Sequence, residues 1–380
     1  MAMKNPTDVV FPYSKIEWEE LKAYNCSRTI QYSAEITLFP ELFCQPIDIA
    51  IELTGSKTVP IANMDKYPMR SVENALGYID AVRKSGIRTI MLRMNAPKLL
   101  TTIDAVLQRQ QDVITRIRSK YDAKSLDIII DPFSVALNEN KTWGILDKNG
   151  DLDYIATAQL FSKITTLFAN ENASYMLTLG RFEREADVTH RTISSLNKPE
   201  TKVASFSTNT ETTNAYVYAD HGAYALTRQK ILVSNSQEMV FRALVDIHEG
   251  SQLIVIKPAE NLHILEKIKT VLRHRKLLEE FLISKAVTDM ARHSVYLQRI
   301  RHIILEDIES FSVKAATVRL GAYTVSGTYF MDMQTKQRKG DAFLKSLLYE
   351  RFCNIAGVLS EHITPGLIID RNALWYFSAK

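Results

Sequence analysis

The chain contains a series of short apolar segments, each ending in polar or turn residues and followed by a stretch with helical spacing of its apolar positions. The apolar segments predict eight strands, at residues 45–52, 88–94, 126–131, 174–179, 202–208, 252–257, 319–326 and 366–370. Helical patterns between them cover residues 71–86, 98–120, 153–169, 236–250 and 340–359. The pattern is therefore one of strands alternating with helices.

The predicted strands are apolar on both faces, which is typical of parallel strands covered by crossover helices. Eight such units predict a closed (β/α)8 TIM barrel. An open doubly wound sheet with extra strands is the alternative, although the sequence lacks the GxGxxG phosphate loop of its dinucleotide-binding versions.

The interval between the sixth and seventh strands is longer than one crossover requires. Residues 271–317 carry apolar side chains at roughly helical intervals, which predicts an inserted helix or helical hairpin. Two roles remain open for it, a packing element over the barrel wall and a subunit contact. His302 and Glu306 are spaced one helical turn apart, and a solvated ion pair explains them better than a metal site.

The amino-acid composition of the chain argues against several classes of protein. The 380 residues include 47 Lys and Arg against 43 Asp and Glu, and the bases are interleaved with acids, so we expect no nucleic-acid partner. Cys26, Cys44 and Cys353 are isolated, which predicts neither disulfides nor a cysteine-based zinc site. No signal-peptide core and no apolar run long enough to span a membrane is present, so we expect a cytoplasmic protein that does not contact membranes.

Lys257 is the first candidate for a reactive residue. Reactive groups of α/β barrels lie at the C-terminal ends of the strands, and Lys257 ends the apolar run QLIVIK. Burial there would lower the pKa of the amine, and a neutral amine is what attacks a ketone to form a Schiff base. The alternative is a lysine that extends into solvent and pairs with Glu260.

Polar residues end three other predicted strands. The seventh strand supplies hydroxyls at Tyr323, Ser326 and Tyr329, which are able either to bind a polar substrate group or to cap the next helix. Asp131 ends the third strand and Asp370 the eighth, and each is a candidate to orient a base or to hold a loop.

Several of these segments together resemble the porphobilinogen synthase (5-aminolevulinate dehydratase) family. QLIVIKPA is similar to the family's lysine-bearing strand end, and AYTVSGTYFM is similar to its AYQVSGEYAM segment, in the same order. SFSTN, TLFPELFCQPIDI and the long segment that starts at Asp131 resemble three further family motifs. The resemblance covers roughly residues 36–373 apart from 271–317, and it implies a TIM barrel.

The chain also departs from the family pattern. The resemblance implies that Lys257 is one of the family's two imine-forming lysines, but the other position is Asn209, which cannot form an imine. Phe133, Val135 and Trp143 stand at the positions of the cysteines that bind catalytic zinc in many members. The resemblance therefore implies a site without a catalytic metal, and we expect no cofactor.

The resemblance further assigns substrate binding to Ser326, Arg228, Asn209 and Arg371, the last at the position of a family tyrosine. The main hypothesis is a lyase-type enzyme that binds an aminolevulinate-like amino-ketone or keto acid as an imine on Lys257, for a condensation or dehydration without metal. Ordinary porphobilinogen synthesis is not expected. The alternative is a non-catalytic family member with a scaffold or ligand-sensing role.

Assembly is predicted from the first 35 residues. In the family an N-terminal arm wraps a neighbouring subunit, and residues 1–35 are polar and aromatic and precede the first barrel strand. Because exposed aromatic side chains need a partner to cover them, we expect a homodimer or a higher homo-oligomer.

Overall fold

The computed structural model describes residues 36–61, 64, 66–95, 102–132, 134–135, 143–208, 235–360, 362 and 364–378. The chain divides into two compact units, residues 1–37 and 38–380, and nearly all described residues belong to the second. The predicted arm, residues 1–35, lies outside the described residues and stays a prediction.

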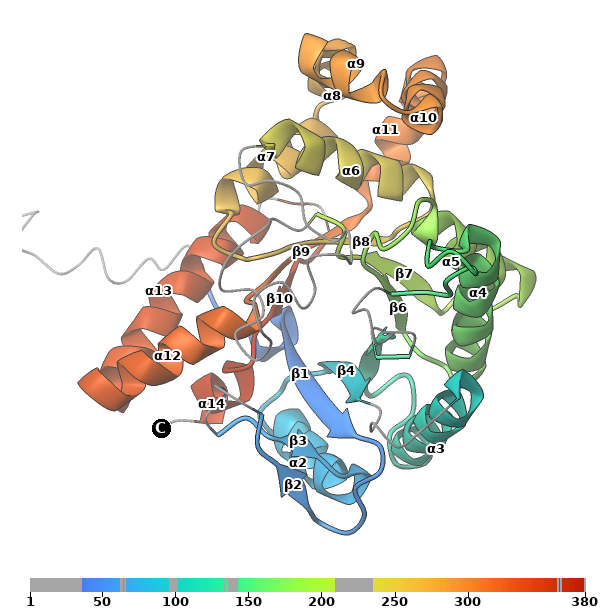
Figure 1. Cartoon of the computed structure of the whole chain (residues 1–380). Coiled ribbons are helices and arrows are strands. Elements are labelled where there is room, and N and C mark those ends of the chain that lie inside the picture. Colours follow the sequence, from blue (N-terminus) through green and yellow to red (C-terminus); the bar gives the residue numbers. More distant parts are fainter. Residues whose placement is uncertain are drawn as a thin grey trace, which may run out of the picture. The chain divides into compact units, whose positions relative to one another are not determined.

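Eight parallel strands form a closed barrel, because the last strand pairs with the first (Figure 1). In ring order they are β1 (Phe43–Ala50), β4 (Thr89–Asn95), β5 (Asp127–Asp131), β6 (Tyr175–Thr178), β7 (Lys202–Ser205), β8 (Leu253–Ile256), β9 (Arg319–Tyr323) and β10 (Leu367–Ile369). Each coincides with one of the eight apolar segments. The predicted (β/α)8 barrel is therefore confirmed.

Two further strands form a small hairpin at the barrel's edge. β2 (Thr58–Val59) pairs antiparallel with β3 (Met69–Arg70), and β3 pairs with the end of β1 through Arg70 and Ile49. The sequence pattern did not predict this hairpin, because two-residue strands are too short to show any periodicity.

The helices cover the outside of the barrel. Five of them lie where the sequence predicted helices: α2 (Val72–Lys84), α3 (Ile103–Lys120), α4 (Tyr154–Asn170), α6 (Ser236–His248) and α13 (Asp341–Ser360). Three start at a side-chain cap, from Ser71, Thr102 and Asp153. The structure adds η3 (Pro40–Leu42), α5 (Glu185–Ser195), α7 (Leu262–Arg273), α12 (Ser326–Lys339) and α14 (Ala373–Ser378).

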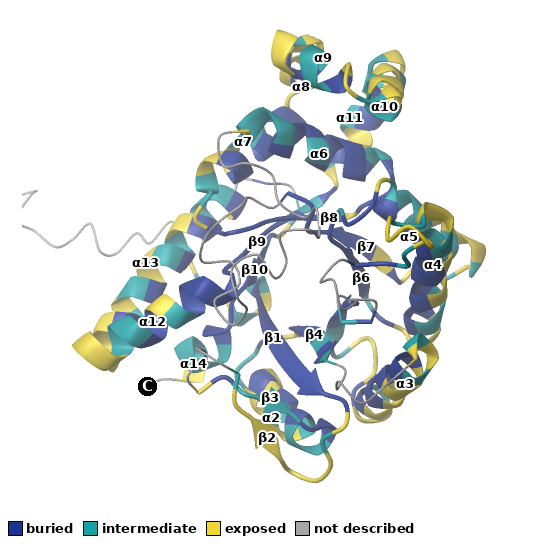
Figure 2. Ribbon diagram, viewed as in Figure 1, coloured by how far each residue is buried: buried dark blue, intermediate teal, exposed yellow. Residues whose placement is uncertain are grey.

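The core consists of the strands and the inner faces of these helices (Figure 2). Every residue of β1 is buried, as are all four of β8. The close packing of strands requires glycine at Gly321 of β9, where a Cβ atom would lie 2.9 Å from the carbonyl oxygen of Leu367 in β10.

Four short helices occupy most of the segment 271–317: α8 (Arg275–Ile283), α9 (Lys285–Ala291), α10 (Val295–Glu306) and α11 (Ile308–Ala316). They pack on α6 and α7, on the side away from the barrel (Figure 1). The sequence predicted one helix or a hairpin. The helical stretch is divided because Ser284, Ser294 and Asp307 each cap a new helix.

No helix in the described ranges is long and apolar enough to cross a membrane. On α10, His302 Nε2 lies 3.0 Å from Glu306 Oε1, and both side chains are exposed. This is the surface pair that the sequence predicted.

Candidate functional site

Four of the residues singled out in the sequence lie at the C-terminal ends of barrel strands. Asp131 is the last residue of β5, Tyr323 is the last residue of β9, and Lys257 directly follows β8. Arg371 lies two residues beyond β10. Since parallel strands of a closed barrel end on one face, these side chains belong to the same end of the barrel.

The remaining candidates follow the seventh barrel strand or are not described. Ser326 is the first residue of α12, and Tyr329 lies one turn further along the same helix; both are buried. Asn209 and Arg228 lie outside the described residues, so their predicted roles stay predictions.

Lys257 is a buried lysine with a perturbed amine. Only 6% of the residue is exposed, so its side chain does not extend into solvent, and Glu260 accepts a hydrogen bond from Thr328 at 2.7 Å. Burial lowers the pKa of Lys257 to about 8; the charge of Asp131 opposes this shift, and the charge of Arg181 adds to it. A substantial fraction of this amine is therefore neutral near pH 8.

The strands on either side fix the backbone around Lys257. Its backbone N–H donates to the carbonyl oxygen of Thr208 at 3.1 Å, beyond the end of β7, and Ala259 donates to the carbonyl oxygen of Tyr323 at 2.9 Å. The Phe206 ring lies 5.8 Å from Lys257 Nζ and 5.9 Å from the Tyr323 ring. Phe206 thus forms an apolar wall shared by the lysine and the tyrosine.

Arg371 is a buried cation with open donors. Its guanidinium lies 5.2 Å from the Tyr67 ring and 5.6 Å from the Tyr323 ring, and the residue is 4% exposed. Within the described residues, Nε and Nη1 donate to no acceptor and no carboxylate forms an ion pair with the group. Tyr67 also contacts Tyr329, with ring centroids 5.5 Å apart. Arg371, Tyr323 and Tyr329 therefore meet around Tyr67, a residue that sequence reasoning missed.

A second missed feature is an ion pair inside the barrel. Arg93 Nε of β4 lies 2.7 Å from Asp48 Oδ1 of β1, and the two are register partners. Although burial favours the protonated acid, Arg93 and Arg371 lower the pKa of Asp48. The signal was present in the sequence, since a charge interrupts each of two otherwise apolar strands.

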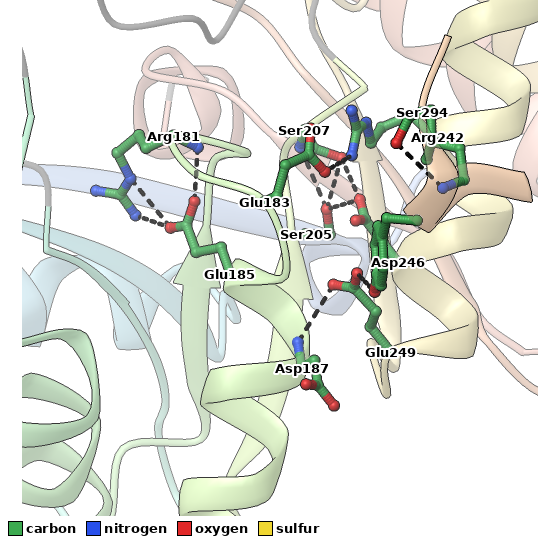
Figure 3. A network of polar contacts seen from close by, with 12 residues as sticks. Arg181, Glu183, Glu185, Asp187, Ser205, Ser207, Arg242, Asp246, Glu249 and Ser294 are labelled. Atoms are coloured by element: carbon green, nitrogen blue, oxygen red, sulfur yellow. Dashed lines mark hydrogen bonds and ion pairs between the residues drawn. The ribbon is translucent and has the colours of Figure 1, made fainter. Parts of the chain in front are cut away.

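Arg181, in the turn between β6 and α5, is the third missed residue. Its Nε donates to Glu185 Oε1 at 3.0 Å, and Glu185 Oε2 accepts from the backbone N–H of Arg181 at 2.7 Å (Figure 3). The guanidinium lies 4.3 Å from the ring centroid of Trp143, which stacks on Phe182 at 6.3 Å. Arg181 is therefore held between an acid and an aromatic face.

Behind β7 lies a buried acidic cluster (Figure 3). Asp246 of α6 accepts hydrogen bonds from Ser205, at 2.6 Å, and from Ser207. Glu249 accepts from the Tyr296 hydroxyl of α10 at 2.5 Å. Burial raises the pKa of Asp246 to about 6, and burial together with the charge of Asp246 raises that of Glu249 to about 8. This cluster joins the inserted helices to the barrel wall.

Asp370 stabilises the turn after β10 through hydrogen bonds. Its carboxyl accepts from Thr324 Oγ1 at 2.6 Å and from the backbone N–H of Asn372 at 2.5 Å. Of the two roles that the sequence left open, orienting a base or holding a loop, these bonds favour holding the loop.

The residues where the resemblance implies zinc cysteines do not fit a metal ion. Val135 and Trp143 are buried and offer no ligand atom of the kind zinc takes, while Phe133 lies outside the described residues. Across the described part of the chain, no group of three His, Cys, Asp or Glu side chains is placed to hold a metal.

Comparison with known proteins adds to this geometry. No known protein family matches the sequence, and no curated protein matches it either. Among solved structures, delta-aminolevulinic acid dehydratase (porphobilinogen synthase) from Toxoplasma gondii ME49, in complex with its reaction product porphobilinogen, matches 97% of this chain and 91% of its own, with 15% identity and a TM-score of 0.67.

Two other solved structures match with lower scores. An Anoxybacillus alpha-amylase is 8% identical over 88% of this chain and 71% of its own, with a TM-score of 0.44. The 7,8-dihydropteroate synthase from Vibrio fischeri ES114 is 9% identical over 91% and 93%, with a TM-score of 0.38. These scores are too low to carry an argument.

The fold thus defines a (β/α)8 barrel with polar and ionisable side chains at the C-terminal ends of its strands, as in barrel enzymes. More particularly, its architecture is similar to that of porphobilinogen synthase along almost the whole length of both chains.

Proposed function

We propose that this protein is a metal-independent enzyme of the porphobilinogen synthase type that binds a keto acid or an amino-ketone as a Schiff base on Lys257. The observation that carries the proposal is the position and state of that amine. It is buried at the end of β8, on the face where barrel enzymes hold their reactive groups, and its pKa is lowered to about 8.

The covalent step consumes no oxidant and no reductant. The neutral amine of Lys257 attacks the carbonyl carbon, which forms a C–N bond and a carbinolamine. The C–O bond then breaks, the oxygen leaves as water, and a C=N bond remains. Asp131, whose charge acts on Lys257, is the proposed proton relay to the departing oxygen.

Arg371 is the proposed carboxylate anchor. It is a buried guanidinium with two open donors and no paired acid among the described residues, so an anionic substrate group would satisfy it. Ser326, Tyr323 and Tyr329 complete this side of the proposed substrate site. Asn209 and Arg228 remain proposed substrate contacts on the strength of the sequence resemblance.

Borohydride trapping tests the imine. The protein is incubated with 5-aminolevulinate or 4-oxopentanoate and then with sodium borohydride, which reduces C=N to a stable amine. Peptide mass spectrometry should find one adduct, at Lys257. Because only the neutral amine attacks, the trapping rate should rise with pH with a midpoint near 8, well below the value of about 10.4 for an ordinary lysine.

Lys257→Met should abolish the adduct. Lys269→Met is the matched control, because Lys269 is equally buried but lies on α7, where it pairs with Glu266 at 2.8 Å. It should trap as the wild type does, and circular dichroism checks that both variants fold. No adduct with any keto acid tested, or an adduct spread over surface lysines, would refute the proposal.

A further inference from the structure

Two buried donors in an aromatic stack after β6 make no hydrogen bond to any described residue. Nη1 of Arg181 and Nε1 of Trp143 lack an acceptor within the described residues, although both residues are at least nine-tenths buried. Buried donors in proteins are nearly always paired, and an exception requires a cause. The two belong to one stack, since the Arg181 guanidinium lies 4.3 Å from the Trp143 ring centroid.

A structural role explains only part of this arrangement. Glu185 binds Nε and Nη2 of Arg181 and the backbone N–H groups of Leu179 and Arg181, so the ion pair holds the turn before α5. It leaves Nη1 unused. Because the other two nitrogens are tied to Glu185 and the plane rests on Trp143, Nη1 is presented in a fixed direction.

The stack and Arg371 lie on opposite sides of the barrel. Arg181 follows β6 and Arg371 follows β10, and these strands are four steps apart in either direction around the ring (β6–β7–β8–β9–β10 and β10–β1–β4–β5–β6). β8, which carries Lys257, is midway on one of these paths. A molecule held by its carboxylate at Arg371 and by its carbonyl at Lys257 therefore directs its other end towards Arg181.

The charge at the two positions differs. Arg371 has no paired acid among the described residues, whereas the charge of Arg181 is balanced by Glu185. A ligand carboxylate at Arg181 would add a second, uncompensated negative charge in a buried place, which is costly. A neutral oxygen would accept from both open donors and add no charge.

We infer that Arg181 and Trp143 form a second substrate-binding position for an uncharged oxygen acceptor, and that the substrate is a keto acid with one carboxylate and, beyond its ketone, an amide, carbonyl or hydroxyl group. This inference rests on the proposed function for the placement of the ketone at Lys257. It assigns the substrate a polarity, with the charged end at β10 and the uncharged end at β6.

A matched set of keto acids tests this assignment. The probes are 7-amino-4,7-dioxoheptanoate, which ends in an amide, 4-oxoheptanedioate, which ends in a second carboxylate, and 7-methyl-4-oxooctanoate, which has an apolar end of the same shape. Each is paired with a homologue one methylene longer. The amide should bind about tenfold more tightly than the apolar compound at one of the two lengths, as measured by calorimetry. The diacid should bind no more tightly than the apolar compound.

Two variants test which residues are responsible. Trp143→Phe keeps the stacked ring but removes the N–H, and it should lose most of the preference for the amide. Trp375→Phe, the matched control on α14, should keep it. In ¹⁵N spectra the indole signal of Trp143 should shift with the amide only. The double variant Arg181→Met/Glu185→Met removes both buried charges together and should also lose the preference.

A diacid that binds more tightly than the amide would overturn the inference, as would equal binding of amide and apolar compounds at both lengths, or a full preference in Trp143→Phe. Lys257→Met separates this inference from the proposed function. If the amide preference persists there while the wild type traps no keto acid, the imine proposal is wrong and the binding position stands. If trapping occurs without preference, only the binding position is wrong.

Discussion

Two arginines flank the last barrel strand, the part-buried Arg351 and the buried Arg371, and their donors are satisfied in different ways. Arg351 of α13 makes two bonds to Asp332 of α12, at 2.8 and 2.7 Å, and Asn372 donates to the same acid at 2.9 Å. Arg371 lies on aromatic rings with two donors open. Arg351 is neutralised by an acid of the fold itself, whereas Arg371 keeps two donors open for the substrate carboxylate that we propose it binds.

Replacement of each arginine by methionine is the strongest test of this comparison. Arg351→Met leaves the Asp332 carboxylate buried with only Asn372, and we expect the free energy of unfolding to fall by about 3–5 kcal/mol. Arg371→Met removes a buried charge that acts on Asp48 without forming an ion pair with it, and Asp48 keeps its ion pair with Arg93, so the free energy of unfolding should fall much less than in Arg351→Met while keto-acid binding is lost. Urea unfolding and calorimetry measure the two effects. A similar loss of stability in both variants would break the comparison.

We expect a smaller, pH-dependent effect on stability from the buried acidic cluster of Asp246 and Glu249. The pKa of Glu249 is raised to about 8 in the folded protein, so between pH 4.5 and 8 the folded state binds more protons than the unfolded state. Stability from this group is full below pH 4.5 and is lost as the pH rises through 8. Glu249→Gln should flatten the decline, on the order of 1–3 kcal/mol, in thermal unfolding measured from pH 5 to 9. A decline of unchanged size in the variant would show that Glu249 is not its source.

The smallest effect is expected at the surface. His302 and Glu306 pair on α10, but their side chains are 72% and 62% exposed, so solvent screens them. His302→Ala should change the free energy of unfolding by no more than about 0.5 kcal/mol. A change comparable to that of Arg351→Met would mean that pairing, and not burial, determines the contribution of a charge in this protein.

Much of the fold was predictable from the sequence. The strands of a closed parallel barrel are buried on both faces, so each appears as an apolar run, and helices with a clear apolar stripe alternate with them. Helix α5 was missed because its buried residues include Glu185 and Thr189, which interrupt the apolar spacing. The β2–β3 hairpin was missed because it is too short to carry a pattern.

Some residues of the candidate site could be predicted from the sequence, and others could not. Lys257 and Asp131 were found because they end apolar runs, and a barrel brings such ends to one face. Arg371 was noticed through the resemblance, but its open donors were not visible in the sequence. Arg181, Trp143 and Tyr67 lie in connections, where no periodicity marks a residue as buried or as a neighbour of the lysine.

Local patterns of apolar residues were enough to predict the eight barrel strands, their parallel arrangement and the lysine at the end of β8. The folded chain alone shows which charges are neutralised by a partner and which keep open donors. Whether Arg351 pairs with Asp332, or Arg371 lies against aromatic rings with two donors open, depends on contacts between segments far apart in the chain, and no local pattern encodes those contacts.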